Sequence, residues 1–224
     1  MAMMDDAGRQ LVSDAVTAAE GATSGEIVTV LADSSDGYTD VALLWAAGAA
    51  FTAMSVFAAF PAPFLEAWDA MTGGWGHEWT SGEIASMVIA LGLVKFLGVW
   101  LVQQWQPLKW LLVPGPVKTI RVHNQAVRQF RVGAERRTTG RTGVLIYLSM
   151  RERRAEIVAD ESIAAKVPAE VWGEAMGDML AQIRKGAIAE GLAVGISDVG
   201  FILAEHFPRG AGDVNELPDR LIEV

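Results

Sequence analysis

Two long apolar runs dominate the hydropathy pattern of the chain. They cover Val41–Phe60 and Ile84–Val102, and polar sequence lies before and after the pair. A helix of about 20 apolar residues, rising about 1.5 Å per residue, spans the roughly 30 Å hydrocarbon core of a bilayer. The pattern therefore predicts a two-helix transmembrane hairpin within residues 38–113. Because two crossings return the chain to the side on which it began, the flanking polar parts can fold together.

The alternative for the two runs is a pair of helices buried in the core of a soluble protein. Val41–Phe60 contains no charged residue, and tryptophans lie near the ends of the runs, as in the aromatic belts of membrane proteins. These tryptophans are Trp45, Trp68, Trp100, Trp105 and Trp110. Lys95 is the single ionisable residue inside either run, and its long side chain can extend to the membrane interface. Such a residue can also mark a functional site within the bilayer. The pattern favours lipid around both runs.

The polar parts of the chain alternate between helical and strand patterns. Three short runs rich in β-branched residues predict buried strands at Gly25–Leu31, Val144–Met150 and Ala155–Asp160. Helical spacing predicts four helices: one capped by Asp5 or Asp6 and ending near Gly21, one over Val117–Val132, one from Pro168 to Gly186, and one from Ile188 to Pro208. A right-handed crossover would make the first two strands parallel, and the short turn after the second strand predicts an antiparallel hairpin.

This order of elements predicts an α/β fold in which helices cover a small mixed sheet. Residues 1–37 would form the first part of the domain and residues 114–208 the second, with 209–224 as a C-terminal tail. Neither part alone could bury the sheet. The hairpin would therefore interrupt one domain.

Charge is distributed unevenly along the 224 residues, whose net charge is −9. Residues 1–37 carry seven acids against the single base Arg9, and the connection Pro61–Glu83 carries four acids and no Lys or Arg. Residues 109–141 carry eight basic residues against Glu135. Basic residues near the ends of membrane helices are retained on the cytoplasmic side. We therefore expect the N- and C-termini and the α/β domain to be cytoplasmic, with a short, Trp-rich loop outside.

The basic helix Val117–Val132 is the next predicted element after the second apolar run. Anionic lipid is its expected partner, since each basic side chain near a membrane surface contributes about 1 kcal/mol. Pairing with the acidic N-terminal segment ranks second. Nucleic acid is not expected, because no stacking aromatic residues are interleaved with the basic ones.

Candidate metal ligands follow two of the predicted strands. Asp33 and Asp36 follow the first strand, and Asp160 and Glu161 follow the third. Closely spaced carboxylates can supply oxygen ligands to Ca²⁺ or Mg²⁺. The alternatives are a solvated turn at Asp33 and Asp36 and a helix N-cap at Asp160 and Glu161. Because the third strand runs against the first, their carboxyl ends should lie at opposite edges of the sheet, which argues against one joint site.

No convergent catalytic set emerges from the sequence. The three histidines lack ligand spacing, and Gly140–Gly143 lacks the Lys and the following helix of a P-loop. The absence of cysteine excludes disulfides, zinc–thiolate sites and cysteine catalysis. No cofactor is required by any pattern in the chain.

The ordered set of strand motifs resembles the TPM family. The resembling segments are Thr23–Val30, Thr142–Ser149 and Arg153–Asp160, and the match covers most of residues 1–37 and 118–208. The chain is similar in particular to uncharacterised bacterial membrane proteins of this family, in which a transmembrane pair interrupts the domain after its first strand. Their ending resembles Ala204–Pro208 followed by Asn215–Leu221. The resemblance implies an α/β/α sandwich and a location in the bacterial inner membrane. Family members have been linked to acid phosphatase activity, divalent metal binding and the maintenance of membrane protein complexes.

Two functions follow as hypotheses. The first is a non-enzymatic accessory or scaffold protein, whose cytoplasmic TPM-like domain holds or helps to assemble another membrane protein. The alternative is a divalent-metal-dependent phosphatase that uses Asp33, Asp36, Asp160 or Glu161.

Overall fold

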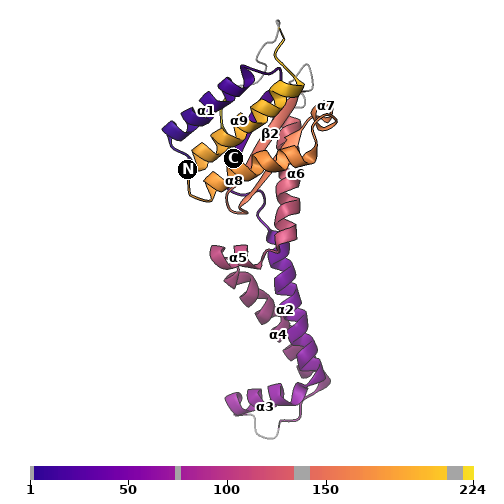
Figure 1. Cartoon of the computed structure of the whole chain (residues 1–224). Coiled ribbons are helices and arrows are strands. Elements are labelled where there is room, and N and C mark those ends of the chain that lie inside the picture. Colours follow the sequence, from indigo (N-terminus) through magenta and orange to yellow (C-terminus); the bar gives the residue numbers. More distant parts are fainter. Residues whose placement is uncertain (1–2, 74–76, 134–141, 211–218) are drawn as a thin grey trace. The chain divides into compact units, whose positions relative to one another are not determined.

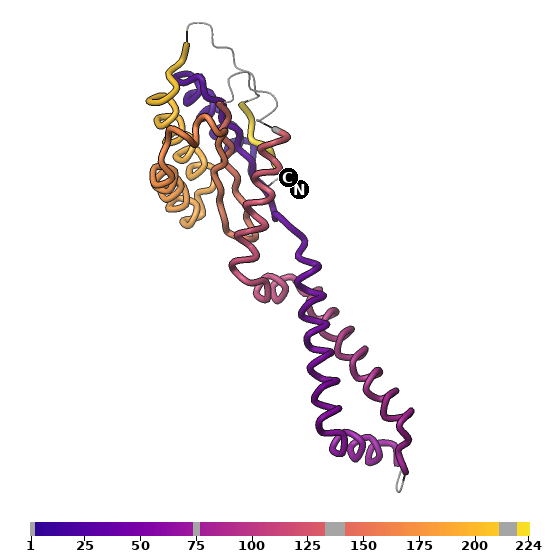
Figure 2. Tube along the Cα trace, turned by 90° about the vertical axis from the view of Figure 1, so that its right-hand side faces the viewer, coloured from indigo at the N-terminus to yellow at the C-terminus, as the bar shows by residue number. Residues whose placement is uncertain are grey.

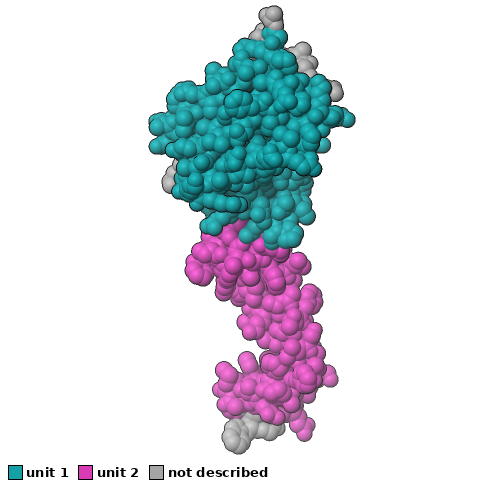
Figure 3. Space-filling view, viewed as in Figure 1, with its two compact units in different colours: residues 1–36, 115–224 teal, residues 37–114 magenta. Residues whose placement is uncertain are grey.

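The computed structural model describes residues 3–73, 77–133, 142–210 and 219–224. The chain forms two compact units, coloured separately in Figure 3. Unit 1 contains Met1–Asp36 and Gly115–Val224, and unit 2 contains Gly37–Pro114. Part of the Gly140–Gly143 segment, part of the basic stretch 109–141 and most of the Asn215–Leu221 segment lie outside the described residues.

Unit 1 combines helices and strands in the order that the sequence predicts (Figure 1). Its elements are α1 (Asp6–Glu20), β1 (Glu26–Ala32), α6 (Gly115–Gly133), β2 (Gly143–Ser149), β3 (Arg154–Ala159), α7 (Glu161–Ala164), α8 (Ala169–Ile183), α9 (Ile188–His206) and β4 (Ile222–Glu223). The Asp5 carboxylate accepts a hydrogen bond from the Gly8 amide and caps α1, as expected.

The sheet is mixed and has the order β3-β2-β1-β4. β1 pairs with β2 in parallel, with Glu26 opposite Gly143 and Ala32 opposite Ser149, while β2 and β3 are antiparallel. Both predicted pairings are therefore confirmed. β4 was not predicted as a strand within the tail. It pairs in parallel with β1 and places Ile222 opposite Val30.

The sheet is covered on both faces, which makes the fold an α/β/α sandwich (Figure 2). On one face, residues from α1, α8 and α9 form a core with Ile27, Leu31 and Ile146. On the other face, Val122, Ala126 and Phe130 of α6 pack against strand residues that include Val28, Leu145 and Tyr147. Because both faces are covered, every residue of β1 and β2 is buried.

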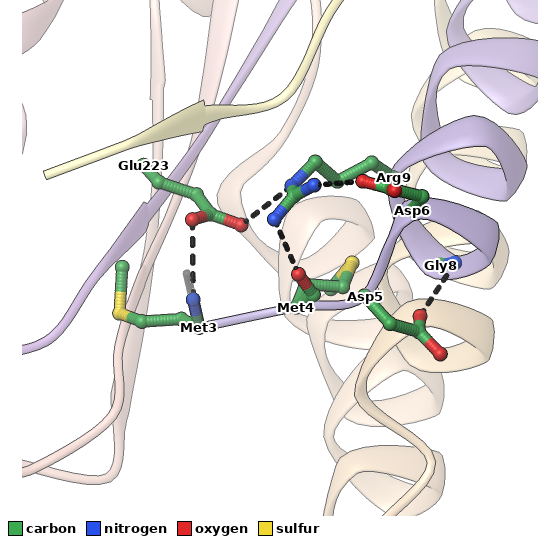
Figure 4. Close-up of polar contacts among 7 residues, drawn as sticks. All are labelled: Met3, Met4, Asp5, Asp6, Gly8, Arg9 and Glu223. Atoms are coloured by element: carbon green, nitrogen blue, oxygen red, sulfur yellow. Dashed lines mark hydrogen bonds and ion pairs between the residues drawn. The ribbon is translucent and has the colours of Figure 1, made fainter. Parts of the chain in front are cut away.

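The parts of unit 1 that precede and follow unit 2 in the chain are joined by polar contacts as well as by the core. Figure 4 shows Glu223 of β4 accepting hydrogen bonds from the Met3 amide and from Arg9 of α1, each at 3.1 Å. Arg9 also donates to the Met4 carbonyl and pairs with Asp6. Burial alone would raise the pKa of Glu223, but these hydrogen bonds and the positive charge of Arg9 lower it. These contacts therefore join the segment of unit 1 that precedes unit 2 in the sequence to the segment that follows it.

Unit 2 contains the two predicted apolar helices. They are α2 (Thr39–Ala59) and α4 (Ser81–Val102), which pack against each other, and both are long and apolar enough to cross a membrane. Little of the apolar window of each helix is buried: 22% of the α2 window and 6% of the α4 window. This exposure argues against the alternative of core helices in a soluble protein.

Two segments of unit 2 differ from the expectation. The connection expected to be an outer loop contains the helix α3 (Pro61–Thr72), and the proline-rich stretch after α4 contains the short helix α5 (Gln106–Leu112). A proline lies in the first turn of each helix, where its fixed φ favours helix and its missing N–H is not needed. α3 ends at Gly73, which adopts a φ of 76° that suits glycine. The prolines therefore start helices in both segments.

Candidate functional site

A buried polar network lies where the parallel strands β1 and β2 end. We call Ser35, Tyr147, Ser149 and Glu152 the strand-end network. The Ser35 hydroxyl lies 3.0 Å from the hydroxyls of both Tyr147 and Ser149. Glu152 accepts hydrogen bonds from the Ser149 hydroxyl and from the Ser35 amide, the latter at 2.9 Å. Burial is the main cause that raises the pKa of Tyr147, so its hydroxyl stays protonated. The network ties the loop after β1 to the turn after β2.

The predicted ligands Asp33 and Asp36 lie beside this network, and each forms an ion pair. Asp33 pairs with Arg151 at 2.9 Å, and Asp36 pairs with Arg121 of α6 at 3.1 Å. The backbone of Asp33 is also held, since its amide donates to the Val224 carbonyl and its carbonyl accepts from the Arg151 amide. The turn is thus a charge-neutralised junction between β1, β2, β4 and α6.

Asp160 and Glu161 lie at the opposite edge of the sheet, where β3 ends and β2 begins. The buried Asp160 carboxylate accepts a hydrogen bond of 2.9 Å from the Gly143 amide. Asp160 occupies the N-cap position of α7, but its side chain makes no capping hydrogen bond to that helix. The predicted capping role is therefore wrong for the side chain, which anchors the start of β2 instead.

A cavity of about 1140 Å³ opens between α6 and the β3–α7 junction. Asp160 and Glu161 line it together with Ser162 and Arg131. It therefore places two of the predicted ligands, a hydroxyl and a guanidinium around one space.

The four predicted metal ligands form two separate pairs. Along β2, the Asp160 end at Gly143 and the Asp33 end at Ser149 are separated by six residues, or about 20 Å at 3.3 Å per residue. The expectation that the two pairs lie at opposite edges is confirmed. Among the described residues, no group of three Asp, Glu or His side chains is arranged to hold a metal ion. Binding of Ca²⁺ or Mg²⁺ at either pair remains a prediction.

Glu20 is a buried acid that the sequence reasoning missed. Its carboxylate accepts a hydrogen bond of 2.7 Å from the Ile27 amide of β1. Thr17 donates to Asp219 at 2.7 Å, and a cavity of about 100 Å³ is lined by both of these residues, Glu20 and Glu26. Burial, followed by the nearby carboxylates of Glu26 and Asp219, raises the pKa of Glu20 to about 8, although the Ile27 hydrogen bond opposes the shift.

The spacing of apolar residues along α1 indicates that Glu20 is buried. Glu20 follows Val12 and Val16 at intervals of four residues, and all three are buried on one face of α1. An acid that continues an apolar row indicates a buried carboxyl group.

The histidines remain apart, as the sequence predicts. His77 lies 3.3 Å from Glu83, His123 lies 3.4 Å from Glu156, and His206 ends α9. The first pair belongs to unit 2 and the second to unit 1. No described arrangement of these residues forms a Ser/His/Asp set.

Comparison with known proteins relates part of unit 1 to a known family. The family model described as the TPM domain matches residues 117–200. No curated protein matches the chain. Among solved structures, the BA42 protein from the psychrophilic bacterium Bizionia argentinensis, determined by NMR, is similar with a TM-score of 0.57 and 18% sequence identity. The alignment covers 100% of this chain and 97% of that chain. At this identity the likeness supports the fold, in agreement with the observed sandwich.

Proposed function

Because this chain is a TPM-domain protein, we propose that it is a membrane-anchored accessory protein whose TPM domain holds or helps to assemble another membrane protein. The observation that supports this proposal most strongly is the insertion of two exposed apolar helices, α2 and α4, between β1 and β2 of that domain. In lipid, these helices would keep both parts of unit 1 at one membrane surface. A domain held in this way meets membrane proteins at high effective concentration.

The chemistry of the loop after β1 supports a structural rather than a catalytic role. Asp33 and Asp36 pair with arginines, and the strand-end network consists of side chains that hydrogen-bond one another. Such mutually satisfied buried groups fix a local conformation. The loop after β1 therefore serves to join the split domain.

Anionic lipid is the proposed partner of α6. Its buried face carries Val122, Ala126 and Phe130, whereas Arg128 and Arg131 are exposed on its other side. α6 begins at Gly115, directly after unit 2 in the chain. Exposed arginines there would strengthen attachment to acidic headgroups.

A site-specific crosslinking experiment tests the accessory function. Phe201 of α9 is 74% exposed and Leu11 of α1 is 40% exposed, which makes both suitable for replacement by a photoreactive amino acid in cells. We expect one integral membrane protein to crosslink to the chain at one of these positions. Excess chain without the photoreactive group should compete for this protein and reduce the adduct. The buried Leu192, replaced in the same way, is the control and should give no adduct. Failure to trap any membrane protein from exposed positions on all helices of unit 1 would contradict the proposal.

The cavity beside α7 favours a second candidate function, a divalent-metal-dependent phosphatase. Glu161 and Asp160 would supply oxygen ligands, and Arg131 would bind a phosphate oxygen. Calorimetry with Ca²⁺ and Mg²⁺, and hydrolysis of a generic phosphomonoester, test this candidate. We expect Glu161→Gln to abolish both signals, while Glu170→Gln on α8 leaves them intact. Purified chain that neither binds metal nor hydrolyses the ester would remove this candidate.

A further inference from the structure

The helix α3, between the two apolar helices, is amphipathic. Phe64, Trp68 and Met71 recur at intervals of four and three residues and share one face, whereas Glu66 and Asp69 lie on another. The three apolar side chains are 38%, 46% and 83% exposed. α3 has no buried residue. Much of this apolar face is therefore exposed among the described residues of unit 2.

The apolar face of α3 continues the apolar surface of α2. Only Phe60, itself 66% exposed, separates the two helices, and the rings of Phe57 and Phe64 lie 5.2 Å apart. Figures 1 and 2 both show α3 running across the direction of α2 at the end of the hairpin. Whatever covers the exposed surface of α2 therefore extends onto α3.

The polar side of α3 is acidic and is held in place. Asp69 accepts a hydrogen bond of 3.3 Å from the Trp79 indole, and the following helix starts with a capping box between Thr80 and Glu83. No Lys or Arg occurs between Arg9 and Lys95. This end of the hairpin therefore carries negative charge on one side of α3 and aromatic side chains on the other.

We propose that α3 lies flat in the interface between membrane and water on the non-cytoplasmic side. Phe64, Trp68 and Met71 would face the lipid, and Glu66 and Asp69 would face water. This inference rests on the proposed membrane anchoring of α2 and α4. Tryptophan prefers the headgroup level, and an amphipathic helix buries its apolar face at the boundary with the acyl chains. Membrane spans would precede and follow α3 in the chain and hold it at the membrane surface. Its binding to lipid therefore needs no basic residues.

Lipid suits this face better than a second copy of the chain does. Two copies packed through α3 would bring together the acids of two segments that lack basic residues, and like charges at close range repel. A zwitterionic lipid surface carries no such penalty.

Spin labelling in lipid bilayers tests the inference, and the absence of cysteine in the chain makes single-site labelling direct. Nitroxides on the variants Met71→Cys and Glu66→Cys report collisions with oxygen, which concentrates in lipid, and with a water-soluble nickel chelate. We expect oxygen to dominate at position 71 and the nickel chelate to dominate at position 66, with a several-fold difference in their accessibility ratio. Met71 and Glu66 are both exposed, so neither change removes a core contact.

A third label separates this inference from the anchoring on which it rests. Leu93 lies near the middle of α4 and is 58% exposed, so Leu93→Cys reports whether that helix is in lipid. Nickel access at position 93 would overturn the anchoring itself. Lipid exposure at position 93 with equal nickel access at positions 71 and 66 would overturn only the interfacial placement of α3. The interfacial placement would also be overturned if the spectrum of the label at position 71 showed dipolar broadening and neither oxygen nor the nickel chelate reached that label. This result would indicate that a second copy of the chain covers the face.

Discussion

At the residue scale, Glu20 couples the stability of the TPM domain to pH. Its folded-state pKa of about 8 lies above the usual 4.5, so the folded domain holds a proton that the unfolded chain releases between these values. The contribution to stability is complete below about pH 4.5 and is lost as the pH rises through 8. Asp198, whose pKa burial also raises, contributes with the same sign.

The variant Glu20→Gln should remove most of this pH dependence. The amide mimics the protonated acid and can keep the acceptor for the Ile27 amide. Between pH 5 and pH 8 we expect the free energy of unfolding of unit 1 to fall by on the order of 2 kcal/mol in the natural chain and by much less in the variant. Hydrogen exchange of the β1 and β2 amides measures it. Equal pH profiles for the two chains would contradict a protonated Glu20.

The strand-end network gives a second prediction at this scale. Glu152→Ala removes the acceptor of the buried Ser35 amide and of the Ser149 hydroxyl. Leaving these donors unsatisfied should lower the free energy of unfolding by about 2–4 kcal/mol. Glu152→Gln keeps an acceptor and should cost less, as urea unfolding would show. If both variants were as stable as the natural chain, the network would not hold the loop after β1.

Some of these roles could be predicted from single residues and others could not. The Asp5 cap follows from a residue type and its position before an apolar helical pattern. The ion pairs of Asp33 and Asp36 could not be predicted, because Arg151 and Arg121 reach them only through the sheet register and the placement of α6. The long-range pairing of Asp219 with Thr17 is hidden for the same reason.

At the element scale, glycines determine how closely α8 and α9 pack. A Cβ on Gly191 would lie 2.9 Å from the Met179 carbonyl oxygen, a backbone atom that cannot rotate away. A Cβ on Gly195 would also lie within about 3 Å of the Met179 side chain. Gly191 and Gly195 therefore permit close packing of α9 against α8.

Gly191→Ala should therefore destabilise unit 1, by about 1–3 kcal/mol for an overpacked contact. The matched control is Gly177→Ala on α8, where the added methyl group meets no atom within 4 Å. That change should stabilise the domain by up to about 1 kcal/mol through helix propensity. Thermal unfolding of the two variants should shift in opposite directions. Shifts of the same sign would show that the helices do not pack at this distance.

The first three strands of the sheet could be predicted because each is a short, mainly apolar run that contains β-branched residues. β4 could not, since its two residues become a strand only by pairing with Val30 and Leu31 of β1. α3 is not evident from the sequence, because its two prolines and the tryptophans in and after it are also typical of a loop. Gly92 of α4 shows a similar limit: small-residue spacing says little in general, yet a Cβ there would lie 2.6 Å from the Met54 sulfur of α2.

At the scale of the whole molecule, the chain leaves one domain after its first strand and returns to finish it. The core of unit 1 draws on Val12 and Val16 before unit 2 and on Ile146, Leu192 and Leu203 after it. Neither part alone can cover both faces of the sheet, so folding of the TPM domain must await synthesis of the apolar helices. The hydropathy pattern predicted that the two apolar helices interrupt one domain, and the division of the chain into two units agrees with it.

The most direct test of the account is the sidedness of three single cysteines introduced into the cysteine-free chain. Asp14 and Glu190 are exposed in the two parts of unit 1, and Glu66 is exposed between the apolar helices. A membrane-impermeant maleimide should label Asp14→Cys and Glu190→Cys only in inside-out vesicles, and Glu66→Cys only in right-side-out vesicles. Labelling of all three positions from the same side would contradict the membrane-spanning hairpin and the role built on it.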